Sequence, residues 1–410
     1  MRILYLSQYF PPEIGATQNR AYEMASNLVE LGHHVTMITE LPNHPSGIIH
    51  PEYKGKVFHR SQLDGIDVIR VWVKTSPVKN FTNRILFYLS YMFISIFTGL
   101  ALTRGKFDII YATSPPLFVG GAALVLSFLK RVPLVFEVRD IWPESAVKLG
   151  ELSNKHAIRL ATSLEVSCYK RAIIIVVVTK GIMEHLCCKG IDEQKISLIP
   201  NGANISLFHF QKSARQRIRE QLEITDKFVV IYAGVFGIAQ GLETIIDTAE
   251  IIQERDDIQF LLIGDGPTKD IISQQIKQKD LSNITLHSAV PRDIIPAYLS
   301  SADVALIPLR KINLFKGALP SKIFDAWACE RPILLCVDGE ARVVMEEAAG
   351  GLFVPPEEPF MLANAVLKLK NDPELRAEMG KNGRKFTENF YSRKALAIEL
   401  AKLLEVTIID

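Results

Sequence analysis

The sequence is poor in the features that mark several large classes of protein. Only five of its 410 residues are cysteines, and they form no C-x-x-C pair. We therefore expect no zinc site of the paired-cysteine type, and interpret the cysteines as small buried side chains in a reducing compartment. The opening residues, MRILYLS, contain no small-residue cleavage site, so we expect no secretory signal and a cytoplasmic protein.

The glycine fingerprint of dinucleotide-binding folds is also missing. The loop QYFPPEIGA holds a single glycine, Gly15, where that fingerprint needs three at fixed spacing, which counts against a nicotinamide dehydrogenase. There is no dense basic stripe either, because 47 basic residues are balanced by 45 acidic ones, so we expect no nucleic-acid partner. The balance is uneven: residues 1–196 hold 22 basic and 16 acidic side chains, and residues 197–410 hold 25 and 29.

What the sequence does contain is an alternation of short apolar runs with amphipathic stretches. Such alternation predicts an α/β protein with doubly wound parallel sheets. It occurs twice, and Pro200, Asn201 and Gly202 interrupt it. We therefore expect one domain from residues 1–196 plus 386–410, and a second from 197–385. Strands are expected at residues 2–7, 34–39, 68–73, 109–113, 134–138, 173–178, 228–233, 260–263, 304–307 and 333–336.

One segment, which begins at Ile85 and ends at Leu102, is eighteen residues long and carries no charge. This length is at the threshold for a membrane-spanning helix. Its aromatic residues suit an interface better than a bilayer centre, and a span would divide one α/β domain. A buried or domain-edge helix, shallow insertion into a membrane surface and a true span all stay open.

Ligands of open parallel sheets bind beyond the carboxyl ends of the strands, so the loops there are candidate sites. In the first half, Gly15 at a helix start could bring backbone N–H groups to an anion, and Arg20 could add charge. A tight turn with a surface arginine fits those residues equally well. Asp140 follows a strand in the segment RDIWPES, where a functional cleft edge is favoured over a structural ion pair.

In the second half, YAGVFG and LIGDGP end two strands with glycines that allow close backbone approach. The segment FKGALPSKIFD combines a glycine-containing loop with a helix start, near Lys316 and Lys322. A diphosphate bound there would meet N–H groups and positive charge. Asp325, one turn further on, could accept both hydroxyls of a ribose. Ordinary turns and a surface aspartate are the alternative explanation for each motif alone.

Six motifs in order resemble those of one enzyme family. LPSKIFDAWACERPIL is similar to the donor-site helix of the family 4 retaining glycosyltransferases of the GT-B fold. The other five are YFPPEIGATQNR, EVRDIWPES, ISLIPNGANISLF, YAGVFGIAQGLETII and LLIGDGP. The chain most resembles the bacterial O-antigen and capsule branch, which includes N-acetyl-L-fucosamine transferases. The resemblance implies two Rossmann-like domains with a cleft between them, the C-terminal one for a nucleotide-sugar and the N-terminal one for the acceptor.

The resemblance also implies roles for individual residues. Asp325 stands at the second carboxylate of the family's E-x7-E motif, which binds the ribose, and Gly317 stands at the first, usually a contact to the donor sugar. Backbone near Pro291 is expected to meet the base. The implied catalytic residues are Asp140 and Lys322; the implied donor-binding residues are Gly234, Phe236, Gly237, Gln240, Gly264, Asp265, Pro291, Lys316, Gly317, Ala318, Leu319, Ser321 and Asp325; and Gly15 and Arg20 are expected on the acceptor side.

The chain departs from the family in the glycine loop GVFGIAQG, which lacks the usual Arg and Lys that bind the donor phosphates. Lys322, Lys316 or Arg310 is expected to replace them. The resemblance implies that the donor is a nucleotide-sugar, with UDP favoured as the nucleotide, and that no metal is essential. It also implies that the departing phosphate itself accepts the proton of the acceptor hydroxyl.

For the acceptor, we expect a polyprenyl-diphosphate-linked saccharide at the inner face of the cell membrane, reached through the segment from Ile85 to Leu102. Two other functions stay open. One is a nucleotide-sugar epimerase of the GT-B fold, and the other is a non-catalytic membrane-associated subunit.

Overall fold

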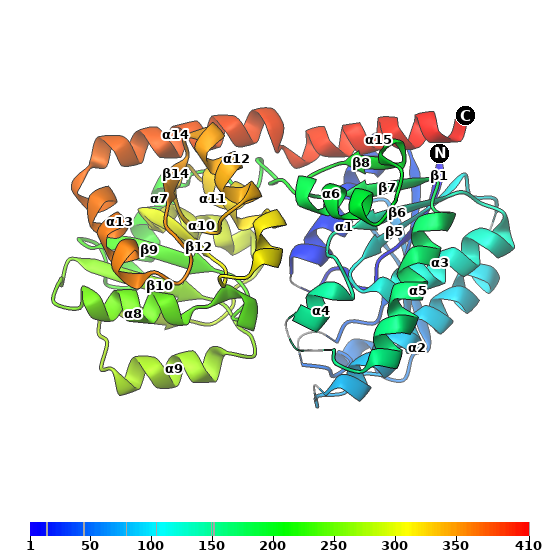
Figure 1. Cartoon of the computed structure of the whole chain (residues 1–410), viewed down its shortest axis with the longest axis horizontal. Coiled ribbons are helices and arrows are strands. Elements are labelled where there is room, and N and C mark those ends of the chain that lie inside the picture. The colour runs from blue at the N-terminus through cyan, green and yellow to red at the C-terminus, as the bar shows by residue number, and fades with distance from the viewer. Residues whose placement is uncertain are drawn as a thin grey trace. The chain divides into compact units, whose positions relative to one another are not determined.

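The computed structural model describes residues 1–13, 15–43, 46–78, 80–103, 105–148, 150 and 152–409. The chain forms two compact units, which are shown in Figure 1. Unit 1 comprises residues 1–200 and 394–410, and unit 2 comprises residues 201–393. These borders lie four and eight residues beyond the 196 and 385 expected from the sequence. The later return follows from a backbone bridge that holds Ala203 beside Ser392 and so keeps the end of the long penultimate helix in unit 2.

The described part of unit 1 is built on an eight-stranded sheet in the order β3-β4-β2-β1-β5-β6-β7-β8. All neighbouring strands are parallel except β3 and β4, which form an antiparallel edge. The strands are β1 (Arg2–Leu6), β2 (His34–Glu40), β3 (Phe58–Leu63), β4 (Ile66–Val71), β5 (Ile109–Ser114), β6 (Leu134–Val138), β7 (Ile174–Val177) and β8 (Ile196–Leu198).

Helices cover both faces of this sheet. On one face α1 packs together with α15, whose Leu396, Leu400 and Leu404 are buried among residues of β1, β2 and β5. The other face carries α2, α3, α5 and α6. The helices are α1 (Ala16–Glu30), α2 (Phe81–Ala101), α3 (Leu117–Lys130), α4 (Glu144–Lys148), α5 (Lys155–Arg171), α6 (Lys180–Cys188) and α15 (Arg393–Ile409), with short 3-10 turns at Pro51–Tyr53 and Glu193–Lys195.

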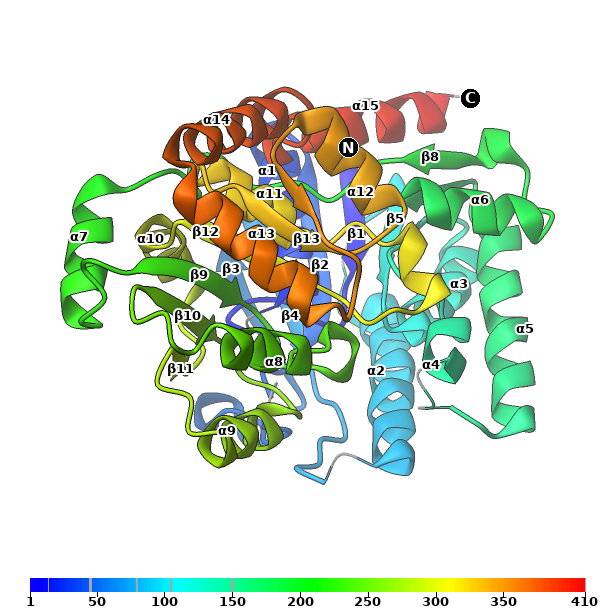
Figure 2. The ribbon, with the colours of Figure 1, turned by 60° about the vertical axis from the view of Figure 1, so that its left-hand side comes forward.

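Unit 2 repeats the layered arrangement around a six-stranded parallel sheet in the order β11-β10-β9-β12-β13-β14. Residues of α7, α10, α11 and α12 fill the core on one face, and residues of α8, α9 and α13 fill it on the other. Figure 2 shows α8, α9 and α13 on one side of the sheet.

The strands of unit 2 are β9 (Phe228–Ala233), β10 (Ile258–Ile263), β11 (Ile284–His287), β12 (Val304–Pro308), β13 (Ile333–Cys336) and β14 (Gly351–Phe353). The helices are α7 (Lys212–Gln221), α8 (Glu243–Ile251), α9 (Lys269–Gln278), α10 (Ile295–Ser301), α11 (Lys322–Ala328), α12 (Glu340–Ala348), α13 (Pro359–Asn371) and α14 (Pro373–Phe390), with 3-10 turns at Ile238–Gln240, Arg292–Ile294 and Asn313–Gly317.

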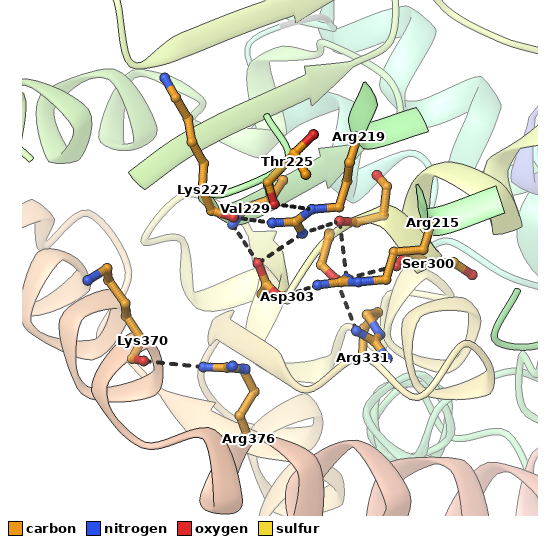
Figure 3. Close-up of polar contacts among 12 residues, drawn as sticks. Arg215, Arg219, Thr225, Lys227, Val229, Ser300, Asp303, Arg331, Lys370 and Arg376 are labelled. Carbon is orange, nitrogen blue, oxygen red and sulfur yellow. Dashed lines mark hydrogen bonds and ion pairs between the residues drawn. The ribbon is translucent and has the colours of Figure 1, made fainter. Parts of the chain in front are cut away.

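A buried carboxylate ties α7 to this sheet (Figure 3). Asp303, just before β12, accepts a hydrogen bond of 2.8 Å from the backbone N–H of Val229 and pairs with Arg215 at 2.7 Å and Arg219 at 3.3 Å. Burial alone would raise the pKa of Asp303, but the two guanidinium groups and the backbone N–H outweigh it and lower that pKa. The ionised carboxylate is therefore part of the folded structure.

Every strand expected from an apolar run is present, and the described residues form four additional strands. The strand expected at residues 173–178 is β7, which lies between β6 and β8 and is parallel to both. The additional strands are β3, β8, β11 and β14. The sequence of β3, FHRSQL, is mostly polar because an edge strand needs no continuous apolar run, and the other three span only three or four residues.

The uncharged segment from Ile85 to Leu102 forms most of α2 with an unusual division of surfaces. Its buried residues are Tyr91, Ser95, Thr98 and Gly99, whereas the exposed fractions of Phe93 and Phe97 are 61 % and 67 %. Among the described residues, α2 is the one helix long and apolar enough to cross a membrane by length and composition alone. Tyr91, Ser95 and Thr98 thus face the protein, whereas Phe93 and Phe97 face outward.

The cysteines differ among themselves. Cys168, Cys329 and Cys336 are buried as expected, and all five are free thiols. Cys188, at the end of α6, is exposed, because that end of the helix lies at the surface of unit 1.

Candidate functional site

The candidate donor site of unit 2 is the edge of the sheet at which its strands end. The chain moves outward from β9 to β10 and β11, then returns to place β12 on the opposite side of β9. The loops after β9 and β12 therefore diverge in opposite directions. In open α/β sheets such a reversal is the usual place for a ligand.

The turn after β9 brings backbone groups close together. A Cβ atom on Gly264, at the end of β10, would lie only 1.9 Å from the carbonyl oxygen of Gly234, so the two turns can approach this closely only through glycine. Gly237 begins the 3-10 turn that contains Gln240, whose side-chain oxygen lies over Gly237. The expected glycine contacts thus belong to one compact pair of turns.

The side chain of Phe236, a residue expected at the donor site, turns into unit 2, so that only its backbone could meet a ligand. Its side chain is fully buried and packs near Tyr232, with ring centroids 5.9 Å apart. Its backbone N–H donates a hydrogen bond to the carbonyl oxygen of Asp265, and its own carbonyl oxygen accepts hydrogen bonds from the backbone N–H and the hydroxyl of Thr268. The phenyl ring is therefore part of the core of unit 2 and leaves no side chain at this position for a donor contact.

Lys322, the first residue of α11, lies beside the β9 turn. Its Nζ donates a 2.7 Å hydrogen bond to the hydroxyl oxygen of Tyr232 and lies 4.0 Å from the centroid of that ring. Lys322 as a whole is half-buried, but its ammonium group is enclosed at this point. Burial lowers the pKa of Lys322 to about 7, and the carboxylate of Asp325 opposes this shift. A cation that binds and releases a proton near neutral pH thus stands at the strand reversal.

The loop before α11 carries the remaining residues expected at the donor site. Lys316 is exposed, Gly317 and Ala318 are half-buried, and the side chain of Leu319 is buried in the core, so that only its backbone could meet a ligand. Ser321 directly precedes α11, and its carbonyl oxygen accepts a 3.3 Å hydrogen bond from the N–H of Asp325. Asp325 is half-buried, one turn along α11 from Lys322.

A cavity of about 360 Å3 adjoins this loop at the ends of β12, β13 and β14. Its lining includes four basic side chains and one acidic one: Arg310, Lys311, Lys316, Arg342 and Asp338. The loops that enclose it are in direct contact, because a Cβ on Gly339 would lie 2.1 Å from the carbonyl oxygen of Lys316. The cavity therefore has an excess of positive charge next to the loop expected to meet the donor.

Arg310, one of three cations considered as replacements for the family's phosphate-binding residues, has a structural role here. Its guanidinium donates to the carbonyl of Ile238 at 2.7 Å and to the carboxylate of Glu243 at 2.9 Å, with Glu357 at 3.7 Å. It therefore fixes the loop after β9. Lys322 and Lys316 are the other two cations in that group.

The two outer donor-site candidates lie on the far side of β9. Asp265 follows β10, is 57 % exposed at its side chain, and accepts from the N–H of Gly266 and from Lys269. Pro291 is exposed after β11 and begins a 3-10 turn. Both follow strands of the parallel sheet.

In unit 1 the sheet reverses between β1 and β5. Asp140 follows β6 next to that point and is half-buried, and its carboxylate accepts a 3.0 Å hydrogen bond from the hydroxyl of Ser145. Gly15 directly precedes α1 and has extended backbone, and a Cβ atom added to it would lie 2.4 Å from the side-chain oxygen of Gln18. Gln18, which the sequence did not single out, thus covers the backbone expected to meet an anion.

Arg20 corrects an expectation from the sequence. It is fully buried and pairs with Glu137 of β6 at 2.8 Å, and it donates to the carbonyls of Ile199 and Pro200. Burial alone would raise the pKa of Glu137, but Arg20 and then Arg139 outweigh it and lower that pKa to about 2. Arg20 is therefore a structural cation that joins α1, β6 and the end of β8, in place of the acceptor-side contact that was expected.

Tyr232 and Glu137 are residues that the sequence did not single out. Both lie within buried strands, where the sequence positions of one aromatic residue or one charged residue do not indicate a functional role. Their partners, Lys322 and Arg20, are 90 and 117 residues away in the chain. Only the tertiary contact shows the pairing.

Comparison with known sequences gives two family matches that together span most of the chain. Residues 15–202 match the glycosyl transferase 4-like domain, and residues 214–386 match the glycosyl transferases group 1. Escherichia coli K12 WcaI, named as a proposed colanic acid biosynthesis glycosyl transferase, is 26% identical over 352 residues, which is 84% of each chain. The alpha-monoglucosyldiacylglycerol synthase of Acholeplasma laidlawii is 22% identical over 427 residues, covering 100% of this chain and 98% of the relative.

Among solved structures, Anabaena HepE in complex with UDP-glucose has a TM-score of 0.76. It is 18% identical, and the match covers 99% of this chain and 100% of that one. At this identity the likeness shows a shared fold across both units.

Proposed function

The chain is a glycosyltransferase of the GT-B fold, and from that premise we propose that it transfers a sugar from a UDP-sugar to a lipid-linked saccharide, with retention of configuration. The sugar proposed is an N-acetylated deoxyhexosamine, and the product belongs to a surface polysaccharide such as O-antigen or capsule. Unit 2 binds the donor and unit 1 the acceptor. Support for polysaccharide or glycolipid synthesis comes from the two curated relatives, WcaI and the diacylglycerol enzyme.

The observation that carries the donor proposal is the position of Lys322 at the strand reversal beside β9. A leaving diphosphate gains charge in the transition state, and a pre-positioned cation in a site with little water stabilises it. Lys322 is that cation, Asp325 accepts hydroxyls of the ribose, and Lys316 adds positive charge. HepE, which shares the fold, is described as a complex with UDP-glucose, and this favours UDP as the nucleotide.

The proposed reaction breaks the bond between the anomeric carbon and the donor's diphosphate oxygen. A hydroxyl oxygen of the acceptor forms the new bond on the same face of the sugar, and its proton passes to the departing phosphate. No protein base is needed in this scheme, so Asp140 serves to orient the acceptor. We also propose that no metal is required, because Lys322 and backbone N–H groups meet the charge of the diphosphate.

The proposed acceptor is a polyprenyl-diphosphate-linked saccharide, and α2 is the element proposed to contact the membrane that carries it. The exposed residues Phe93 and Phe97 suit the boundary between headgroups and acyl chains. The enzyme would then be a cytoplasmic protein bound to the inner face of the cell membrane.

The donor proposal is tested by thermal shift against a panel of UDP-, GDP-, TDP- and CMP-sugars, followed by a transfer assay with the sugar that stabilises the protein most. We expect a UDP-sugar to give the largest increase in melting temperature. We also expect transfer to require the lipid-linked acceptor and to proceed equally with and without EDTA. Conversion of the donor alone, without acceptor, would instead identify a nucleotide-sugar epimerase. No shift with any donor would favour a non-catalytic subunit.

The membrane proposal is tested by flotation with liposomes that contain anionic lipid. We expect the wild type to float and the F93S/F97S variant to stay in the soluble fraction. F360S is the matched control, because Phe360 of unit 2 is 70 % exposed and plays no part in the proposal. Equal flotation of all three proteins would contradict a role for α2.

A further inference from the structure

Tyr232, the fifth residue of β9, contacts the ammonium group of Lys322 in two ways at once. The Lys322 Nζ lies 4.0 Å from the ring centroid and donates a 2.7 Å hydrogen bond to the phenolic oxygen. The hydroxyl proton is directed elsewhere, to the carbonyl oxygen of Val235 at 2.6 Å. The phenolic oxygen is therefore oriented as an acceptor toward Lys322, and the ring face adds a cation–π contact.

The third wall of this arrangement is Gly234. A Cβ atom at that position would lie 2.1 Å from Nζ and 2.3 Å from Cε of Lys322. No other residue leaves this space open, so the end of the lysine side chain fits into a gap made by one glycine. Together, Tyr232 and Gly234 fix where a flexible four-carbon side chain places its charge. We call Tyr232, Gly234 and Lys322 the lysine cradle.

We propose that Tyr232 is a positioning residue for the transfer reaction. It holds the ammonium group of Lys322 over Gly234, and there the ammonium group donates hydrogen bonds to the diphosphate of the donor. This inference rests on the proposed function. It adds a residue that acts through Lys322 and does not itself touch the donor. It also gives a reason for the departure in the glycine loop, because a cation supplied from α11 must be directed toward the β9 turn by a partner on β9.

The charges around Lys322 are consistent with this role. Asp325, on the same helix, is the carboxylate that favours its protonated form, and burial disfavours that form. Burial raises the pKa of Tyr232 far above its usual value, so the phenol stays neutral. An arriving diphosphate therefore meets a lysine that is held in place and becomes fully charged as the anion binds.

The test is a double-mutant cycle on UDP binding, measured by calorimetry at pH 6.5 with the full chain. We expect Y232F to bind UDP about three- to tenfold more weakly, and Y232L about 30-fold more weakly because the ring is also lost. In a K322M background, Y232F should change the affinity less than twofold, since the residue acts through Lys322. Y169F is the matched control, because it removes the buried hydrogen bond between Tyr169 and Glu165 in unit 1.

A second measurement separates positioning from simple structural support. The ligand-free protein can also be labelled with 13C at lysine Cε and titrated by NMR. One lysine signal should titrate near pH 7 in the wild type. This signal should be missing in K322M and should titrate at lower pH in Y232F.

Three outcomes would overturn the proposal. If Y232F weakens binding equally with and without Lys322, the positioning role fails while the donor site stands. If the labelled lysine titrates at the same pH in Y232F, the cradle does not act on Lys322. If the wild type binds no UDP, GDP or TDP, the proposed function fails, and the role of Tyr232 in it fails too.

Discussion

At the residue scale, Lys322 and Asp325 are the side chains on which the proposed chemistry depends most. We expect K322M and D325N each to lower kcat/KM at subsaturating donor by about 100-fold, since each removes a charged contact to the leaving nucleotide. K279M is the control, because Lys279 pairs with Asp247 and Glu250 away from the site. Near wild-type turnover in both variants would contradict the donor-site assignment.

The affinity for the donor should depend on pH through Lys322. In the free protein this lysine loses its proton as the pH rises through about 7, whereas a bound diphosphate stabilises the protonated form and raises the pKa. Binding therefore takes up a proton, and UDP affinity should fall by up to about tenfold per pH unit between pH 7.5 and 9. Calorimetry in buffers of different ionisation enthalpy should show that uptake, and the pH dependence should vanish in K322M.

Whether the position of a side chain could be predicted from the sequence depends on how far away in the sequence its contact partners lie. Lys322 and Asp325 stand in a continuous motif, so the local pattern predicted correctly that both lie in the first turn of one helix. Arg20 was expected on the acceptor side or at the surface, and its burial depends on Glu137, 117 residues further along. Phe236 stands in a glycine loop but turns into the core. Local pattern identifies a turn, whereas the direction of each side chain depends on distant neighbours.

At the element scale, the attachment of α7 to β9 and β12 depends on Asp303. We expect D303N to destabilise unit 2 by about 2–4 kcal/mol, because it leaves Arg215 and Arg219 without their buried counter-charge. D257N is the matched control: the side chain of Asp257 is 48 % exposed and pairs with Lys370 and Arg255, so its loss should cost less than about 1 kcal/mol. Urea unfolding followed by tryptophan fluorescence measures both.

The same carboxylate makes acid sensitivity a further readout. The pKa of Asp303 is lower in the folded protein than in the unfolded chain, so its contribution is present above the unfolded value and is lost as the pH falls through the folded one. The stability of D303N should therefore depend less on pH below about 4 than that of the wild type. Parallel acid curves for the two proteins would argue against the lowered pKa.

Elements were predictable where burial imposes a pattern. The parallel strands covered by helices on both faces read as apolar runs, and each run was a strand. Edge strand β3 was not predicted because its residues, FHRSQL, follow no apolar pattern. Strand β14 was not predicted because a run of three residues is too short to show a pattern. For α2, the lack of charge predicted an apolar helix, but only the packing of Tyr91, Ser95 and Thr98 shows which face is buried.

At the scale of the whole molecule, the last helix stabilises the unit that the first residues begin. Leu400 of α15 is fully buried against α1 and the adjoining strands. We expect L400A to destabilise unit 1 by about 2–4 kcal/mol through the cavity it leaves. Hydrogen exchange should accelerate in α1 and β1 and stay unchanged in β9 and β12. V406A is the control, since Val406 on the same helix is 60 % exposed.

The return of α15 also has a consequence for the order of synthesis. A ribosome completes all of unit 2 before it makes the helix that covers one face of unit 1. For the time needed to translate nearly two hundred residues, Met24, Leu28 and Val35 belong to a face whose final cover does not yet exist. We therefore expect the nascent N-terminal unit to bind chaperones that shield apolar surface, and its final closure to follow release of the finished chain.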